Sequence, residues 1–290
     1  MTTLQPAPAR SGDPLSGNPL SATPPAALLT GPWGSARIVS VGAVLPAHGI
    51  AHADQLLHPG EPTDFDPVAV LGRKGTRYKD RATLLGVAAA AQALDAAAVD
   101  RTVPRSDIGL LVASCYGNLS AVCENAELID RAGVSSLSPL ALPNASSNVV
   151  ATEISIRRKL QGVVLTVCNG HASGWAALRW GMSLLSAGRS SSVLVVAVEA
   201  PSPHEQQLRG AAAPLVDGAV AVLLTARDAP AVPVRSPGGA PGDETPLPGH
   251  ELAAVHGLLV IARAAARARE TGSAVTCGGG PGEGDWAVLP

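Results

Sequence analysis

The sequence has few aromatic residues and no cluster of basic residues with aromatics between them. Aromatic side chains make up 2% of the 290 residues, and the formal net charge at neutral pH is −2. Proteins that bind nucleic acid or anionic membranes usually carry a basic patch. We therefore expect neither nucleic acid nor a membrane among the partners of this chain.

Cysteine is also scarce, and its spacing is not that of a disulfide or zinc framework. The four cysteines, Cys115, Cys123, Cys168 and Cys277, include no C-x-x-C pair. The N-terminus lacks a basic segment followed by an apolar stretch, and no apolar run reaches the ~20 residues of a membrane span. These absences predict a protein of the reducing cytoplasm.

Nothing in the sequence predicts a metal or a cofactor. His250 and His256 lie six residues apart, which does not place two ligands on one face of a helix. The glycine-rich run 278–284 neither follows a strand nor opens a helix, as a phosphate-binding loop would. We therefore expect no metal site and no cofactor.

What the chain has is a large apolar fraction arranged in alternating patterns. Apolar residues make up 46% of the sequence, which is enough for a substantial core. Short β-branched or aliphatic runs predict strands at residues 36–44, 108–114, 163–167, 193–198 and 219–224. Helical spacing is found at residues 80–98, 118–129, 149–160, 174–186 and 251–270. This alternation predicts an α/β fold with a mostly parallel sheet covered on both faces.

Two segments break the alternation. Residues 1–35 are rich in Pro, Ser, Ala and Gly without periodicity, which predicts a disordered arm. Residues 229–248 are rich in Pro and Gly, which predicts a linker. Only one strong helix follows that linker, so residues 249–290 cannot hold a sheet as large as that of residues 36–228.

The most informative segment is residues 162–174, Gly-Val-Val-Leu-Thr-Val-Cys-Asn-Gly-His-Ala-Ser-Gly. It predicts a strand, a tight turn and a helix that begins near Ala172. A thiol at such a helix N-terminus would be reactive, because the positive end of the helix dipole stabilises its thiolate. The turn instead carries His171, whose cationic form is disfavoured there. The local structure is that of a nucleophile site with a poor nucleophile on it.

Several short motifs resemble, in their order along the chain, those of the β-ketoacyl synthases. They are Asp80-Arg-Ala-Thr-Leu84, Val112-Ala-Ser-Cys-Tyr-Gly117, Leu137-Ser-Pro-Leu-Ala-Leu-Pro-Asn144, and Thr166-Val-Cys-Asn-Gly-His-Ala-Ser-Gly174. The resemblance implies a thiolase-like layered α/β fold, with a mostly parallel five-stranded N-terminal half at residues 36–228. Residues 249–290 would then be a strongly reduced C-terminal half.

The resemblance also shows which catalytic groups are missing. A ketosynthase uses a cysteine as nucleophile and two histidines for decarboxylation and charge stabilisation. Here His171 stands at the cysteine position, no motif resembles the first histidine, and His250 in Gly249-His250 is similar to the second. Loss of such groups typically costs several orders of magnitude in rate. We therefore expect no catalytic residue.

The resemblance implies a chain-length factor that forms a heterodimer with an active ketosynthase in a bacterial type II polyketide or polyene pathway. An acyl carrier protein would be a further partner, reached through the complex. The edge strand would pair with the ketosynthase, and the loop 140–144 would reach toward its acyl tunnel. The interface or tunnel residues expected from this are Leu140, Leu142, Pro143, Asn144, Val163, Leu165 and Val167.

Other interpretations of these residues stay open. His171 is either a hydrogen-bonded residue that fills a vacated pocket or a group with a chemical role. Cys168 is either a small buried apolar thiol or an alternative nucleophile. If either residue is reactive, the chain is an independent acyltransferase or malonyl-carrier decarboxylase. A third possibility is a non-catalytic scaffold that recruits carrier proteins.

Overall fold

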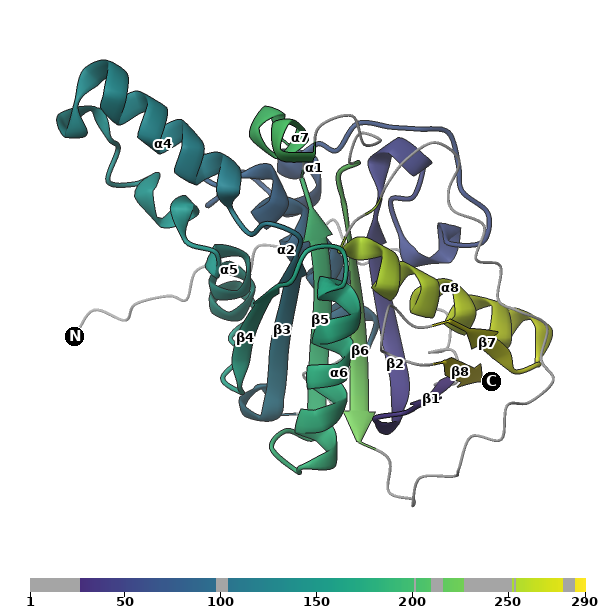
Figure 1. The fold of residues 1–290 in the computed structure, drawn as a ribbon. Coiled ribbons are helices and arrows are strands. Elements are labelled where there is room, and N and C mark those ends of the chain that lie inside the picture. Colours follow the sequence, from purple (N-terminus) through teal and green to yellow (C-terminus); the bar gives the residue numbers. More distant parts are fainter. Residues whose placement is uncertain are drawn as a thin grey trace, which may run out of the picture.

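The computed structural model describes residues 27–97, 104–200, 202–209, 216–226, 252, 254–278 and 285–290. Within these residues one mixed sheet has the strand order β4-β3-β5-β6-β2-β1-β8-β7 (Figure 1). Its strands are β1 (Ala27–Gly31), β2 (Gly34–Val44), β3 (Ile108–Ser114), β4 (Val164–Cys168), β5 (Ser192–Glu199), β6 (Gly218–Ala226), β7 (Val275–Cys277) and β8 (Trp286–Leu289).

The α-helices of the described residues are α1 (Pro67–Leu71), α2 (Arg81–Ala96), α4 (Leu119–Ala132), α5 (Val149–Arg158), α6 (Ser173–Ser186), α7 (Pro203–Arg209) and α8 (Val255–Thr271). Five of the described α-helices lie close to the expected positions, and two short ones, α1 and α7, were not expected. A 3-10 turn, η5 (Leu142–Ala145), precedes α5. None of the helices is long and apolar enough to cross a membrane, within the part of the chain that the structure describes.

The five strands expected in the N-terminal half are adjacent in the sheet and mostly parallel. β3 pairs in parallel with β4 and β5, whereas β6 is antiparallel to both β5 and β2. Four of the five therefore run the same way, with β6 reversed between β5 and β2. The α/β prediction is confirmed, although the reversal of β6 could not be read from its apolar run.

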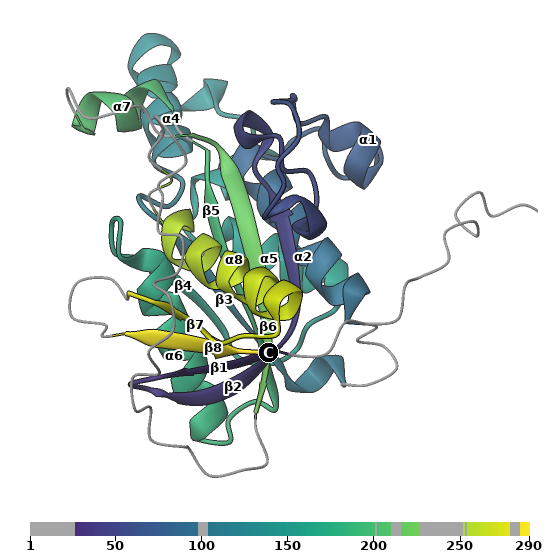
Figure 2. The ribbon, with the colours of Figure 1, turned by 90° about the vertical axis from the view of Figure 1, so that its right-hand side faces the viewer.

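Helices cover both faces of this sheet, as expected (Figures 1 and 2). On β5, Val193, Val195 and Ala197 pack into the core under α6 and α8. The alternate side chains of the same strand pack into a second core under α2 and α5. All eight β5 residues are buried, and the six from Val193 to Val198 are apolar, as expected for a strand covered on both faces.

The expectation of a disordered arm up to residue 35 was wrong for its last nine residues. β1 forms an antiparallel hairpin with β2, from Ala27 opposite Ile38 to Gly31 opposite Gly34. Ala27 and Leu29 are fully buried. Burial of these side chains in the sheet offsets the entropy cost of ordering, which composition alone cannot reveal. Residues 1–26 of the expected arm lie outside the described residues.

The described C-terminal residues extend the same sheet. β8 pairs with β1 on one side and with β7 on the other, so the hairpin adds to the N-terminal sheet edge. α8 packs beside α6, and Trp286 of β8 stacks on Trp175 of α6 with ring centroids 6.4 Å apart. The expected linker, 229–248, lies outside the described residues.

Candidate functional site

The predicted turn between β4 and α6 is present and is closed by its own hydrogen bonds. Ser173 Oγ accepts from the backbone N–H of Asn169 at 2.7 Å and donates to the carbonyl of Gly170 at 2.7 Å. Gly170 has a φ of 58°, a left-handed conformation that suits glycine. The turn is therefore held in one shape, and α6 begins at Ser173, one residue later than expected.

His171 lies at the outer side of this turn, one residue before Ala172, the N-cap of α6. It forms an isolated bridge with Asn169 and is exposed in this chain. It therefore does not fill a closed pocket within the described residues. The expected position at a helix N-terminus is confirmed.

Cys168 ends β4, and its side chain is exposed, contrary to the expectation of a buried thiol. Its sulfur lies beside the β3–α4 turn, where a Cβ built on Gly117 would be 3.3 Å from Sγ. Partial burial raises the pKa of the Cys168 thiol above its ordinary value, and the nearby Glu199 carboxylate raises this pKa further. A raised pKa reduces the thiolate fraction, so Cys168 is a poor candidate nucleophile.

The same turn brings a third segment to the site. A Cβ on Gly117 would also be 3.2 Å from Cβ of Ser147, and its φ of 65° favours glycine. Gly117 therefore lies between the end of β4 and the segment that leads into α5. Three of the motif-bearing parts of the chain thus meet here, at Gly117, Ser147 and Cys168.

Glu199, at the end of β5, is the residue that sequence reasoning missed. It is only 2% exposed, and its carboxylate accepts hydrogen bonds from Ser114 Oγ (3.1 Å), from the Cys115 N–H (3.2 Å) and from the Ala254 N–H (3.4 Å). Burial raises the pKa of Glu199 to about 7, although the hydrogen bonds from Cys115 and Ala254 oppose the rise. An acidic residue that directly follows an apolar strand was the signal that could have identified it.

Glu199 joins the N-terminal half to the start of α8. Its contact with Ala254, the N-cap of α8, places a carboxyl group at the positive end of that helix. α6 approaches the same point closely, since a Cβ built on Gly174 would lie 2.2 Å from the Ala254 carbonyl oxygen. His250, the remnant of the second histidine motif, lies outside the described residues.

β4 forms one edge of the sheet and exposes apolar side chains. Among the described residues its outer edge pairs with no strand. Val163, Val164 and Leu165 are 37%, 41% and 36% exposed, and Val167 is half-buried. The strand begins at Val164, so Val163 lies just before it. An apolar edge of this kind readily pairs with another chain.

The segment 137–148, which includes the expected tunnel loop 140–144, lies on the surface. Leu140 and Leu142 are 64% and 43% exposed, and Pro143 is also exposed. Residues 142–145 form the 3-10 turn η5, where only a loop was expected. Asn144 is half-buried, and its Nδ2 donates to the Tyr78 carbonyl at 2.7 Å.

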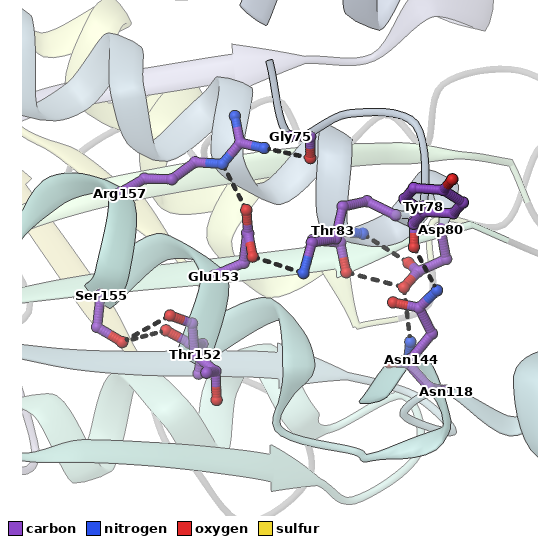
Figure 3. A network of polar contacts seen from close by, with 12 residues as sticks. Gly75, Tyr78, Asp80, Thr83, Asn118, Asn144, Thr152, Glu153, Ser155 and Arg157 are labelled. Atoms are coloured by element: carbon purple, nitrogen blue, oxygen red, sulfur yellow. Dashed lines mark hydrogen bonds and ion pairs between the residues drawn. The ribbon is translucent and has the colours of Figure 1, made fainter. Parts of the chain in front are cut away.

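Tyr78 belongs to the loop 72–80, which polar contacts hold against α5 and α2 (Figure 3). Arg157 Nη2 donates to the Gly75 carbonyl at 2.7 Å, and Lys79 Nζ lies 2.7 Å from Glu153 Oε2. Asp80 caps α2 through the Thr83 N–H at 2.7 Å and accepts from Asn118 Nδ2 at 3.0 Å. This network joins the starts of α2 and α4 to α5.

A family model described as "Beta-ketoacyl synthase, N-terminal domain" matches residues 54–217 of the chain. One curated relative, 3-oxoacyl-(acyl-carrier-protein) synthase 2 from Vibrio harveyi, is 24% identical over 140 residues. This alignment covers 48% of the chain and 34% of the relative, so the chain spans about a third of that relative's length.

Solved structures with a similar fold cover most of the chain. The ishigamide ketosynthase/chain length factor is 20% identical, with a TM-score of 0.65 over 87% of this chain and 97% of that one. A ketosynthase in complex with its chain length factor from Xenorhabdus doucetiae is 18% identical, with a TM-score of 0.58 over 88% and 99%. A type II polyketide synthase acyl-carrier protein in complex with its hexaketide-bound ketosynthase is 13% identical, with a TM-score of 0.66 over 91% and 98%. These similarities show the fold.

Proposed function

The chain belongs to the β-ketoacyl synthase family, and from this premise we propose that it is a non-catalytic subunit of the chain-length-factor type. It would form a heterodimer with an active ketosynthase in a type II polyketide or polyene pathway. An acyl carrier protein would deliver substrates to the complex. The observation that carries the proposal is an exposed apolar edge strand, β4, that leads directly into a turn with His171 at the nucleophile position.

The proposed lack of catalysis is supported by the chemistry of the turn. A condensing enzyme needs a nucleophile that can hold an acyl chain as a thioester. His171 cannot form a thioester, and the raised pKa of Cys168 disfavours its thiolate. The Glu199 carboxylate is buried and accepts hydrogen bonds from three donors of this chain, which gives it a structural role.

The proposed ketosynthase partner is supported by the geometry around β4. Helices α5 and α6 contact β4, and each exposes a large apolar side chain, Ile156 at 69% and Trp180 at 50%. We take these two side chains, together with Val164 and Leu165, as the apolar rim that a partner would cover. Burial of this rim against a second chain would gain about 25 cal/mol for each Å² removed from water. Two of the structurally similar proteins are ketosynthases described together with a chain length factor.

The partnership is tested by co-expression with the ketosynthase encoded nearest to this gene, followed by native mass spectrometry. We expect a stable one-to-one complex. A Leu165→Lys variant should weaken the complex at least about tenfold, because a charge would replace an apolar contact. Val70→Lys serves as the matched control, since Val70 in α1 is 54% exposed and lies away from β4. A monomer or a homodimer that ignores the ketosynthase would contradict the proposal.

The chain-length role is tested with variants of the segment 137–148. Leu142→Phe adds bulk at an exposed apolar position, and we expect the purified complex to release products of a different length. Identical product profiles for the wild type and Leu142→Phe would contradict the chain-length role. The chain would then be a subunit that only stabilises the ketosynthase or recruits carrier proteins.

Independent catalysis remains the competing hypothesis, and acyl loading separates the two. The isolated chain is incubated with an acyl-carrier-protein thioester and analysed by intact mass. We expect no acyl increment. An increment that disappears in Cys168→Ala or His171→Ala would identify an acyltransferase and would refute the non-catalytic role.

A further inference from the structure

Residues 137–148 contain no fully buried side chain. The two leucines of the expected tunnel loop, Leu140 and Leu142, are exposed. The backbone hydrogen bonds of this segment stay within it or reach its neighbours in sequence, Val134 before it and the start of α5 after it. The 3-10 turn η5 packs beside α4 and α5, but no side chain of the segment is buried.

One side-chain hydrogen bond ties this segment to a distant part of the described chain. Asn144 Nδ2 donates to the Tyr78 carbonyl at 2.7 Å, across 66 residues of sequence. Other side-chain bonds of the segment are local, such as that from Ser146 Oγ to Asn148 Oδ1 at 2.6 Å. Asn144 thus supplies the side-chain hydrogen bond that ties the segment to a loop far away in sequence.

The anchor at the other end of this bond is itself fixed. The loop 72–80 is held on one side by Arg157 and by the Lys79–Glu153 pair of α5, and on the other by Asp80 at the start of α2 (Figure 3). Thr76, in the middle of the loop, is buried and donates from Oγ1 to the Arg73 carbonyl at 3.1 Å. The Tyr78 carbonyl is therefore held in place relative to α5 and α2, and so is a side chain that donates to it.

The segment also lies beside the turn at the end of β4. Ser147, three residues after Asn144, is in contact range of a Cβ built on Gly117, which lies equally close to Sγ of Cys168. A displacement of the segment would therefore change the packing next to the β4–α6 turn.

We propose that Asn144 is a positioning residue that fixes residues 137–148 against the Tyr78 carbonyl and thereby sharpens the product length of the complex. This inference rests on the proposed chain-length function. Asn144 contacts no reacting atom and acts by holding Leu140 and Leu142 at one distance from the turn.

Asn144→Asp is the sharpest test, because the side chain keeps its shape but loses the N–H that donates to Tyr78. Asn148→Asp is the matched control: it adds the same charge in the same segment and keeps the acceptor that Ser146 uses. Loss of one hydrogen bond changes a local equilibrium about fivefold. We expect hydrogen exchange of residues 137–148 in the full chain to rise about fivefold in Asn144→Asp and to stay unchanged in Asn148→Asp.

The functional readout is the product profile of the purified complex. In Asn144→Asp we expect the ratio of off-length to wild-type-length products to rise about fivefold, with the affinity for the ketosynthase and the total condensation rate unchanged. Asn144→Gln, which keeps an amide donor on a longer arm, should restore part of the profile. A merely structural role would lower affinity or rate instead, and that result would overturn the inference.

Comparison with Leu142→Phe separates the positioning role of Asn144 from the chain-length function of the subunit. If Leu142→Phe shifts product length and Asn144→Asp does not, the positioning role is wrong and the chain-length function stands. If neither variant changes the profile, the chain-length function is wrong and the positioning role fails with it. Equal exchange rates in Asn144→Asp and Asn148→Asp would also overturn the positioning role, whatever the products.

Discussion

Replacement of Glu199 by Gln should make the protein more stable at alkaline pH and should remove part of the pH dependence of unfolding. The Glu199 carboxyl is 2% exposed, and burial raises its pKa from 4.5 to about 7. Because the folded state binds the proton more tightly than the unfolded state does, this group contributes its full stabilisation below pH 4.5. That contribution is lost as the pH rises through about 7.

The size of the effect follows from the two pKa values. Each tenfold change in a protonation equilibrium is worth about 1.4 kcal/mol, so the difference between 4.5 and about 7 corresponds to about 3 kcal/mol. Gln cannot ionise, but it can accept from the Cys115 and Ala254 N–H groups and donate to Ser114 Oγ. We therefore expect Glu199→Gln to leave stability at pH 5 nearly unchanged and to increase it by up to about 3 kcal/mol at pH 8.5.

The assay is urea unfolding of the full chain at pH values from 5 to 8.5, for the wild type, Glu199→Gln and the control Glu124→Gln. Glu124 is exposed on α4, so its replacement should leave the pH profile of the wild type intact. All other groups are common to the wild type and Glu199→Gln, so their contributions cancel in the comparison. Parallel pH profiles for the wild type and Glu199→Gln would refute the reasoning, because they would mean that Glu199 has no raised pKa in the folded state.

Three further predictions follow from contacts described above. Glu153→Gln should lower the free energy of unfolding by about 2 kcal/mol at pH 7. Burial raises the pKa of Glu153, but the hydrogen bonds from Lys79 and Arg157 outweigh burial, so the pKa is lowered overall. The loss should therefore shrink as the pH falls below 4.5 in urea titrations. Gly174→Ala should lower the free energy of unfolding by about 1–3 kcal/mol, because its Cβ would lie 2.2 Å from the carbonyl oxygen of Ala254; a thermal melt equal to that of the wild type would show that α8 moves aside freely. Cys168 should react with iodoacetamide at pH 7.5 more slowly than free cysteine, because its pKa is raised, and peptide mass spectrometry that finds faster modification would count against the poor-nucleophile assignment.

The comparison of sequence and structure differs from element to element. The β4–α6 turn was predicted to within one residue, because a β-branched run, an Asn-Gly pair and a helical repeat follow one another directly. β1 was missed, because residues 27–31 have the composition of an unordered arm and become ordered only through burial between β2 and β8. Short local signals predict turns well, whereas strand partners far along the chain leave no local signal.

The residues of the site likewise divide into those found from a local motif and those found only from long-range contacts. His171 and Cys168 were found from their place in one contiguous motif. Glu199 and Asn144 were assigned their present roles only from the structure. The three donors to Glu199 lie 85, 84 and 55 residues away, and the acceptor of Asn144 lies 66 residues away.

The sequence by itself determined the α/β class, the apolar faces of the strands and the presence of a histidine at a turn suited to a nucleophile. Periodicity and turn chemistry are local properties, so they can be read from neighbouring residues. Only the tertiary structure decided the antiparallel place of β6, the burial of Glu199 and the bond that holds residues 137–148. Each of these depends on contacts between segments that are far apart in the sequence. The free energy of such contacts comes from burial and hydrogen bonding between segments, which no single segment encodes.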